Sequence, residues 1–162
     1  MNDAGFTETD IEPDYVIIGE SDSYNHHDIC KATDLVHRGA RLICTNPDVC
    51  DPIENGSIEP SGGAWVSVIE KATGKQAYFP GKPNPLMMRS ALDKLNLHSS
   101  EAIMIGDRME TDVLSGIESN LHPVLVLSGV TKESDLKKFP YRPYLVLNDV
   151  GMIPPSEYVP KH

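Results

Sequence analysis

The chain has 162 residues, of which 40% are hydrophobic, and its formal net charge is −10. This length allows one domain or two small ones, and the hydrophobic content is sufficient for a globular core. The acidic charge argues against broad binding to nucleic acid or to an anionic membrane, because such binding requires a basic face. It is compatible with a small phosphate ligand, because one metal ion and one lysine neutralise such a ligand locally.

The three cysteines are Cys30, Cys44 and Cys50, and neither a Cys-x-x-Cys pair nor a zinc-binding spacing accompanies them. We therefore expect reduced thiols. No apolar run approaches the roughly 18 residues of a membrane helix, and the polar N-terminus does not resemble a signal peptide. These features predict a soluble, cytoplasmic protein.

The first part of the chain predicts one βαβ unit. Residues 1–12 are polar and form a lead-in, and the apolar residues 15–19 predict a buried strand. Asn25 is placed to cap a helix that Gly39 ends. Residues 41–45 predict a second strand, so that the order is strand, helix, strand.

A loop rich in Pro, Gly, Asn and Ser is expected over residues 47–63. A helix is predicted over residues 64–72, followed by a short extended segment at 76–79. Residues 80–85 contain Gly and three prolines, which indicates a turn or a domain junction.

The second half repeats the alternation of helices and strands. The predicted elements are a helix at 86–95, a strand at 102–105, a helix at 111–119, a strand at 123–127, a short helix at 134–138 and a strand at 144–147. The strands lack polar alternation, so we expect them to be covered on both faces, as in a parallel sheet. The fold class is α/β.

Two segments carry candidate chemistry. Lys82 lies in Gly81-Lys82-Pro83, and Asp107 and Asp112 follow the predicted strand that ends near Gly106. Ligands of parallel α/β sheets bind beyond the carboxyl ends of strands, and Mg²⁺ prefers oxygen ligands. The pattern therefore fits a Mg²⁺-dependent phosphoryl-transfer site. The simpler alternatives are an ordinary Gly-Asp turn, a first-turn helix aspartate and a solvated lysine.

The order and spacing of several motifs resemble the NagD-like branch of the haloacid dehalogenase superfamily. The motifs are Thr45-Asn46-Pro47-Asp48, Gly62-Gly63-Ala64, Ile69-Glu70-Lys71-Ala72-Thr73-Gly74, Gly81-Lys82-Pro83, Gly106-Asp107-Arg108, Thr111-Asp112 and Leu127-Ser128-Gly129-Val130-Thr131. The resemblance extends over roughly residues 13–149. The branch includes phosphatases of nucleotides, sugar phosphates and other small metabolites.

The resemblance implies a fold in which an α/β cap is inserted into a parallel Rossmann-like core. Residues 13–79 would then be a partial cap that governs substrate specificity, and residues 80–162 would be the C-terminal part of the core. The family's core begins with a strand that ends in Asp-x-Asp-Gly, whose first Asp is the nucleophile. No such motif occurs in this sequence. The chain therefore resembles an N-terminally truncated member of the family.

The resemblance also implies roles for individual residues. Asp107 would bind Mg²⁺, Asp112 would support it, and Lys82 would balance the charge of nucleophile and phosphate. Arg108 is a candidate phosphate contact, with a structural ion pair as the alternative. Asn46 and Asp48 would face the substrate, and their alternative is capping of their own loop by Asx turns.

Two hypotheses about function follow. The first is a Mg²⁺-dependent phosphomonoester hydrolase lineage that works through an aspartyl-phosphate, acts on a small phosphorylated metabolite and is inactive as this isolated chain. The second is a non-catalytic relative that acts as a binding or interaction module, or a gene fragment. In either case we expect no nucleic-acid or membrane partner, and we expect self-association or a complementing N-terminal segment.

Overall fold

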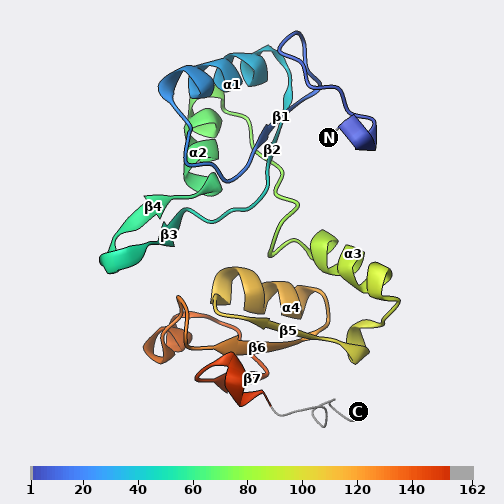
Figure 1. The fold of residues 1–162 in the computed structure, drawn as a ribbon, viewed down its shortest axis with the longest axis vertical. Helices are drawn as coiled ribbons and strands as arrows, with labels where there is room; N and C mark the ends of the chain where they lie inside the picture. Colours follow the sequence, from blue (N-terminus) through green and yellow to red (C-terminus); the bar gives the residue numbers. More distant parts are fainter. Residues whose placement is uncertain (1, 154–162) are drawn as a thin grey trace. The chain divides into compact units, whose positions relative to one another are not determined.

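The computed structural model describes residues 2–153 of the chain. Its residues divide into two compact units, Met1–Pro80 and Gly81–His162 (Figure 1). Each unit has its own hydrophobic core.

The first unit is built on two parallel strands, β1 (Tyr15–Ile18) and β2 (Arg41–Cys44). Ile18 pairs with Cys44, so the two strands end at the same edge. Tyr78 forms a parallel bridge with Ile43 and extends this sheet by a short segment. The strands at 15–19 and 41–45 predicted from sequence are confirmed, each one residue shorter at its end.

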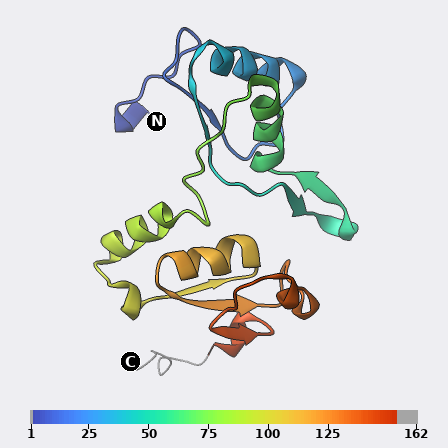
Figure 2. The same cartoon turned by 180° about the vertical axis from the view of Figure 1, so that it is seen from behind.

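Two helices cover one face of this sheet, and both views show them side by side (Figures 1 and 2). Helix α1 (His26–Arg38) begins at Asn25, whose side chain accepts a hydrogen bond from the Asp28 amide, and ends at Gly39 with φ 128°. Helix α2 (Gly62–Thr73) ends at Gly74. The core between helices and sheet contains Val16, Ile18, Ala32, Val36, Ala40, Leu42, Cys44, Val66 and Ile69.

The other face of β1 is exposed. Along β1, Val16 and Ile18 are buried, whereas Tyr15 and Ile17 are 41% and 44% exposed. Among the described residues, α1 and α2 supply cover for one face only. The guanidinium of Arg41 lies 4.0 Å from the centre of the Tyr15 ring and covers part of the open face.

A small antiparallel hairpin lies where the sequence predicted a loop. It consists of β3 (Cys50–Pro52) and β4 (Ile58–Pro60). The prolines and polar residues of this segment are typical of loops. Asn55-Gly56 was a usable hairpin signal, because both residues adopt positive φ angles of 64° and 74° in the connecting turn.

The second unit contains a parallel sheet in the order β5–β6–β7, formed by β5 (Ile103–Gly106), β6 (His122–Val126) and β7 (Leu145–Leu147). Helix α4 (Leu114–Glu118) contacts β5 and β6. Helix α3 (Pro85–Leu95) contacts α4 and buries none of its residues. The central strand β6 is the most buried of the three, with four consecutive buried residues.

Short helical turns complete the described structure. Five are 3₁₀ turns, at Asn2–Ala4, Glu54–Gly56, Ser99–Glu101, Glu133–Lys138 and Val150–Met152, and one is a π turn, at Met109–Val113. The helix expected at 111–119 is therefore a π turn followed by the short α4. No described helix has the length and apolarity needed to cross a membrane.

Candidate active site

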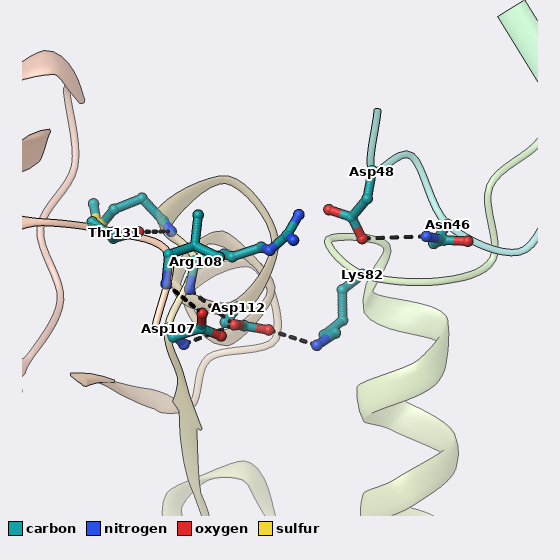
Figure 3. A network of polar contacts seen from close by, with 9 residues as sticks. Asn46, Asp48, Lys82, Asp107, Arg108, Asp112 and Thr131 are labelled. Carbon is teal, nitrogen blue, oxygen red and sulfur yellow. Dashed lines mark hydrogen bonds and ion pairs between the residues drawn. The ribbon is translucent and has the colours of Figure 1, made fainter. Parts of the chain in front are cut away.

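The centre of the candidate site is the turn that follows β5. The Arg108 carbonyl accepts hydrogen bonds from the amides of both Asp112 (3.0 Å) and Val113 (3.1 Å), which makes this turn wider than an α-helical one. The wide turn brings Asp112 back toward the strand end. Its Oδ2 accepts hydrogen bonds from the amides of Asp107 (2.9 Å) and Arg108 (3.0 Å), as Figure 3 shows. Asp112 therefore fixes the backbone that carries Asp107.

Two glycines leave the space that these carboxylates occupy. A Cβ on Gly106 would overlap the side chain of Asp112, and a Cβ on Gly129 would overlap the carboxylate of Asp107. The loop after β6 also contacts Asp107 directly, because the Val130 amide donates to its Oδ2 at 2.8 Å. Glycine at both positions is thus a steric requirement of the site.

Lys82 is the third charged residue of this site. Its Nζ lies 2.6 Å from Asp112 Oδ1, where it forms an ion pair and a hydrogen bond. The Asp112 side chain is 5% exposed and that of Lys82 is 37% exposed. The structure thus brings together Lys82, Asp107 and Asp112, which lie up to 30 residues apart in sequence.

The oxygens of the two aspartates differ in their availability to a metal ion. Lys82 and two backbone amides occupy both oxygens of Asp112. Asp107 Oδ2 accepts from Val130, whereas its Oδ1 accepts no hydrogen bond from the residues that the structure describes. Over the same residues, no three His, Cys, Asp or Glu side chains gather in a metal-binding group. Asp107 Oδ1 is thus the carboxylate oxygen with which Mg²⁺ would fit this site, and the predicted roles of Asp107 as ligand and Asp112 as support stay predictions.

Arg108 lies beside this pair. Its amide donates to Asp112, and its carbonyl accepts the two amides of the π turn. Its predicted role as a phosphate contact stays a prediction.

Asn46 and Asp48 lie in the first unit, on the loop after β2. The Asn46 Nδ2 donates to Glu20 Oε1 at 2.6 Å and approaches Asp48 Oδ2 at 3.3 Å. Glu20 was not singled out from the sequence. Glu20 lies two residues after β1, just as Asn46 lies two residues after β2. This equivalent position after paired strands was the sequence feature that could have identified Glu20. The substrate-facing role of Asn46 and Asp48 stays a prediction.

Comparison with known proteins shows a family match that is confined almost entirely to the second unit. Residues 79–153 match the family described as "HAD-hyrolase-like". The chain is 45% identical to a dihydroxyacetone phosphatase from Corynebacterium glutamicum (strain R) over 151 residues, which are 93% of this chain and 54% of that protein. It is 42% identical to the ribonucleotide monophosphatase NagD from Escherichia coli (strain K12) over 150 residues, which are 93% of this chain and 58% of that protein.

Solved structures give the same result. NagD from E. coli K-12 aligns with a TM-score of 0.83 at 41% identity, over 94% of this chain and 60% of NagD. A 4-nitrophenylphosphatase from Thermotoga maritima aligns with a TM-score of 0.86 at 30% identity, over 93% of this chain and 57% of that one. The chain spans little more than half the length of these relatives. Over almost all of its residues the chain is similar to the NagD-like phosphatases of the haloacid dehalogenase superfamily.

Proposed function

We propose that this chain supplies the lysine and metal-binding part of a Mg²⁺-dependent phosphomonoesterase site. The observation that carries the proposal is the arrangement around Asp112. This buried carboxylate holds Lys82 on one oxygen and the Asp107 backbone on the other. As a result, Asp112 holds in place both the residue with the open carboxylate oxygen, Asp107, and the ammonium group of Lys82. The names of the similar proteins, which are phosphatases, support this reading.

The residues of the chain would divide the work at this site as follows. Mg²⁺, when bound, neutralises phosphate charge and polarises a phosphoryl oxygen. Asp107 would hold the ion, and Mg²⁺ needs only one or two protein carboxylates because it keeps several waters. Lys82 would offset the negative charge of the phosphate and the nucleophile. Asp112 would act on neither, and would keep Asp107 and Lys82 in place.

The family's reaction needs a further group. In it, an Asp carboxylate attacks phosphorus, the ester P–O bond breaks, the alcohol leaves, and water then hydrolyses the acyl phosphate. The attacking Asp belongs to Asp-x-Asp-Gly, which is absent from these 162 residues. We therefore expect this chain by itself to position charge without forming the covalent intermediate, because it lacks the motif that carries the attacking Asp.

We propose a small phosphorylated metabolite as the substrate class. Similar proteins are named dihydroxyacetone phosphatase, ribonucleotide monophosphatase and acid sugar phosphatase. We interpret residues 13–79 as part of the cap, where Asn46 and Asp48 would tune substrate choice, and residues 80–162 as part of the core. The free thiols of Cys30, Cys44 and Cys50 suit the reducing cytoplasm.

The first prediction concerns activity. The isolated 162-residue chain should not hydrolyse p-nitrophenyl phosphate in millimolar Mg²⁺ above the rate without protein, because the nucleophile is missing. The assay follows release of p-nitrophenolate with the wild-type chain and with Asp107→Asn. Turnover at an ordinary rate of about 1–10 per second, lost in Asp107→Asn, would show that another residue of the chain replaces the nucleophile.

The missing motif also favours a second candidate function, a non-catalytic module that binds phosphorylated ligands or a partner protein. Binding of a phosphate monoester near Lys82 without any turnover, in the chain and in every complex it forms, would support this candidate. Turnover that appears when a polypeptide with Asp-x-Asp-Gly joins the chain would support the phosphatase.

A further inference from the structure

The edge of the sheet in the first unit brings two loops together. Ile18 and Cys44 are paired at the ends of the parallel strands β1 and β2. Glu20 and Asn46 each lie two residues beyond this pair, at the edge where parallel α/β sheets carry their ligand sites. Asn46 Nδ2 donates to Glu20 Oε1 at 2.6 Å, so the two loops are joined by a charge-assisted hydrogen bond.

The same carboxylate oxygen also contacts the start of α2. Ser61 Oγ donates to Glu20 Oε1 at 2.5 Å, and the Gly62 amide donates to it at 3.2 Å. The Ser61 side chain makes no capping bond to its own helix. Glu20 therefore supplies the cap from a distant loop, and its negative charge lies favourably at the positive end of the helix dipole.

The third partner, Asn46, is fixed at both ends of its amide. Thr45 Oγ1 donates to its Oδ1 at 2.8 Å, and its Nδ2 is shared between Glu20, Asp48 and Ser61. The carboxylates of Glu20 and Asp48 are the charged acceptors in this group, and Glu20 accepts the shorter bond from Asn46. Partial burial alone would raise the pKa of Glu20, but hydrogen bonds from Ser61, Asn46 and Gly62 bring that pKa below its usual value. The network thus selects the ionised form.

We propose that Glu20 is the positioning residue for the loop of residues 45–48 and is thereby a determinant of substrate choice. The second half of this statement rests on the proposed function, in which that loop faces the substrate. Glu20 acts through Asn46: it sets the orientation of the Asn46 amide and, through the 3.3 Å contact, the place of Asp48. Loss of its charge should release the loop and leave the rest of the unit folded.

The test uses nuclear magnetic resonance on the 162-residue chain. In Glu20→Gln, the side-chain amide signal of Asn46 and the backbone amide signal of Gly62 should both shift, while signals of β5 stay in place. Glu54→Gln is the matched control, because Glu54 is exposed on the β3–β4 turn and lies outside the network. Asn46 and Gly62 signals that are unchanged in Glu20→Gln would overturn the positioning role.

Acid titration of the wild-type chain gives a readout that requires no variant. The Asn46 side-chain signal should titrate with an apparent pKa below that of an ordinary glutamate, and this transition should be lost in Glu20→Gln. Asp48, Asp51 and the Cys44 thiol also lie near Glu20. A transition that survives in Glu20→Gln would therefore belong to Asp48 or Asp51 and would contradict the role of Glu20.

A separate titration distinguishes the positioning role from the substrate role. Glycerol phosphate, a ribonucleoside 5′-monophosphate and a hexose phosphate are added to wild type and to Glu20→Gln. Shifts in residues 45–48 that differ among the three ligands, with an order of affinity that changes in Glu20→Gln, would support a role in specificity. If the ligands leave the signals of residues 45–48 unchanged, the role of Glu20 in specificity and the proposed substrate-facing loop are both wrong. The positioning role does not depend on this titration, because the Asn46 and Gly62 signals in Glu20→Gln decide it.

Discussion

At the scale of single residues, Asp112 is the main organiser of the second unit's site. Its side chain is 5% exposed and accepts three hydrogen bonds, two from backbone amides and one from Lys82. A buried carboxylate is stable when donors and a counter-charge surround it, and it is costly when they are removed. Both carboxylate oxygens of Asp112 already accept hydrogen bonds within the protein. The oxygen that remains open to a metal ion is therefore Oδ1 of Asp107.

Asp112→Asn is expected to destabilise the chain. The substitution places an amide nitrogen against backbone donors or against the Lys82 ammonium, and it leaves that ammonium unpaired. Lys82 is partly exposed to solvent, so we expect a loss of about 2–3 kcal/mol rather than the full cost of breaking a buried pair. The measurement is urea unfolding of both variants, with Asp93→Asn on the exposed face of α3 as control. Equal stability of the two variants would mean that Asp112 does not anchor the turn.

The sequence predicted that Lys82, Asp107 and Asp112 would lie together, but it did not predict the π turn that holds Asp112 against two backbone amides. The Gly-Asp turn and the spacing of five residues indicated two carboxylates at one strand end. The π turn directs the Asp112 side chain back toward the amides of residues 107 and 108. This turn forms because the amides of both Asp112 and Val113 donate to the Arg108 carbonyl. Local propensity does not predict such a turn, which also depends on tertiary contacts such as the hydrogen bond from the Met109 amide to Thr131 Oγ1.

At the scale of elements, apolar runs with clear end signals were predicted correctly. Asn25 and Gly39 bound α1 as expected, and Pro85 stands at the first turn of α3. The hairpin β3–β4 was missed because both of its strands contain prolines and exposed residues, and lack alternating apolar residues. Its two strands pair with each other through backbone hydrogen bonds, which a hydrophobic pattern does not report.

Gly63 is the position where the first unit is expected to tolerate least change. A Cβ there would overlap the carbonyl oxygen of Pro47 and lie 2.7 Å from that of Asp48. Both are backbone atoms, and the Gly63 amide donates to the Asp48 carbonyl at 2.8 Å, so neither side can move freely. Gly63→Ala should therefore cost about 1–3 kcal/mol of unfolding free energy.

Gly19→Ala is the matched control for this prediction. Its Cβ would lie 3.5 Å from the Thr45 methyl carbon, an ordinary contact, so a change within about 0.5 kcal/mol is expected. Thermal or urea unfolding of the two variants gives the comparison. If both variants are as stable as wild type, the loop at Pro47 does not pack against α2 as described.

At the scale of the whole molecule, the sheet of the second unit has an open edge. Among the described residues, β5 pairs only with β6. Ile103 at this edge is 37% exposed, and Leu86 and Met87 on α3 are 42% and 43% exposed. An unpaired strand edge next to exposed apolar side chains pairs readily with another chain.

We therefore predict that the chain self-associates through β5 or binds a complementing segment there. Light scattering at low micromolar concentration should give a mass above that of the monomer. Ile103→Lys should reduce this mass, whereas Val146→Lys on the opposite edge strand β7, where the side chain is 36% exposed, should not. A compact wild-type monomer that unfolds cooperatively would show that the edge is closed in another way.

The central claim is that the carboxyl end of β5 is the metal-binding part of a phosphatase site. It is tested most directly by adding Mn²⁺, a paramagnetic substitute for Mg²⁺, to the chain and following the amide signals by nuclear magnetic resonance. One open carboxylate oxygen should bind weakly, with a dissociation constant on the order of millimolar or higher. We predict that the amides of Asp107 and Val130 broaden first, that excess Mg²⁺ restores them, and that Asp107→Asn abolishes the effect while Asp93→Asn retains it. Equal broadening in Asp107→Asn and wild type would contradict the account.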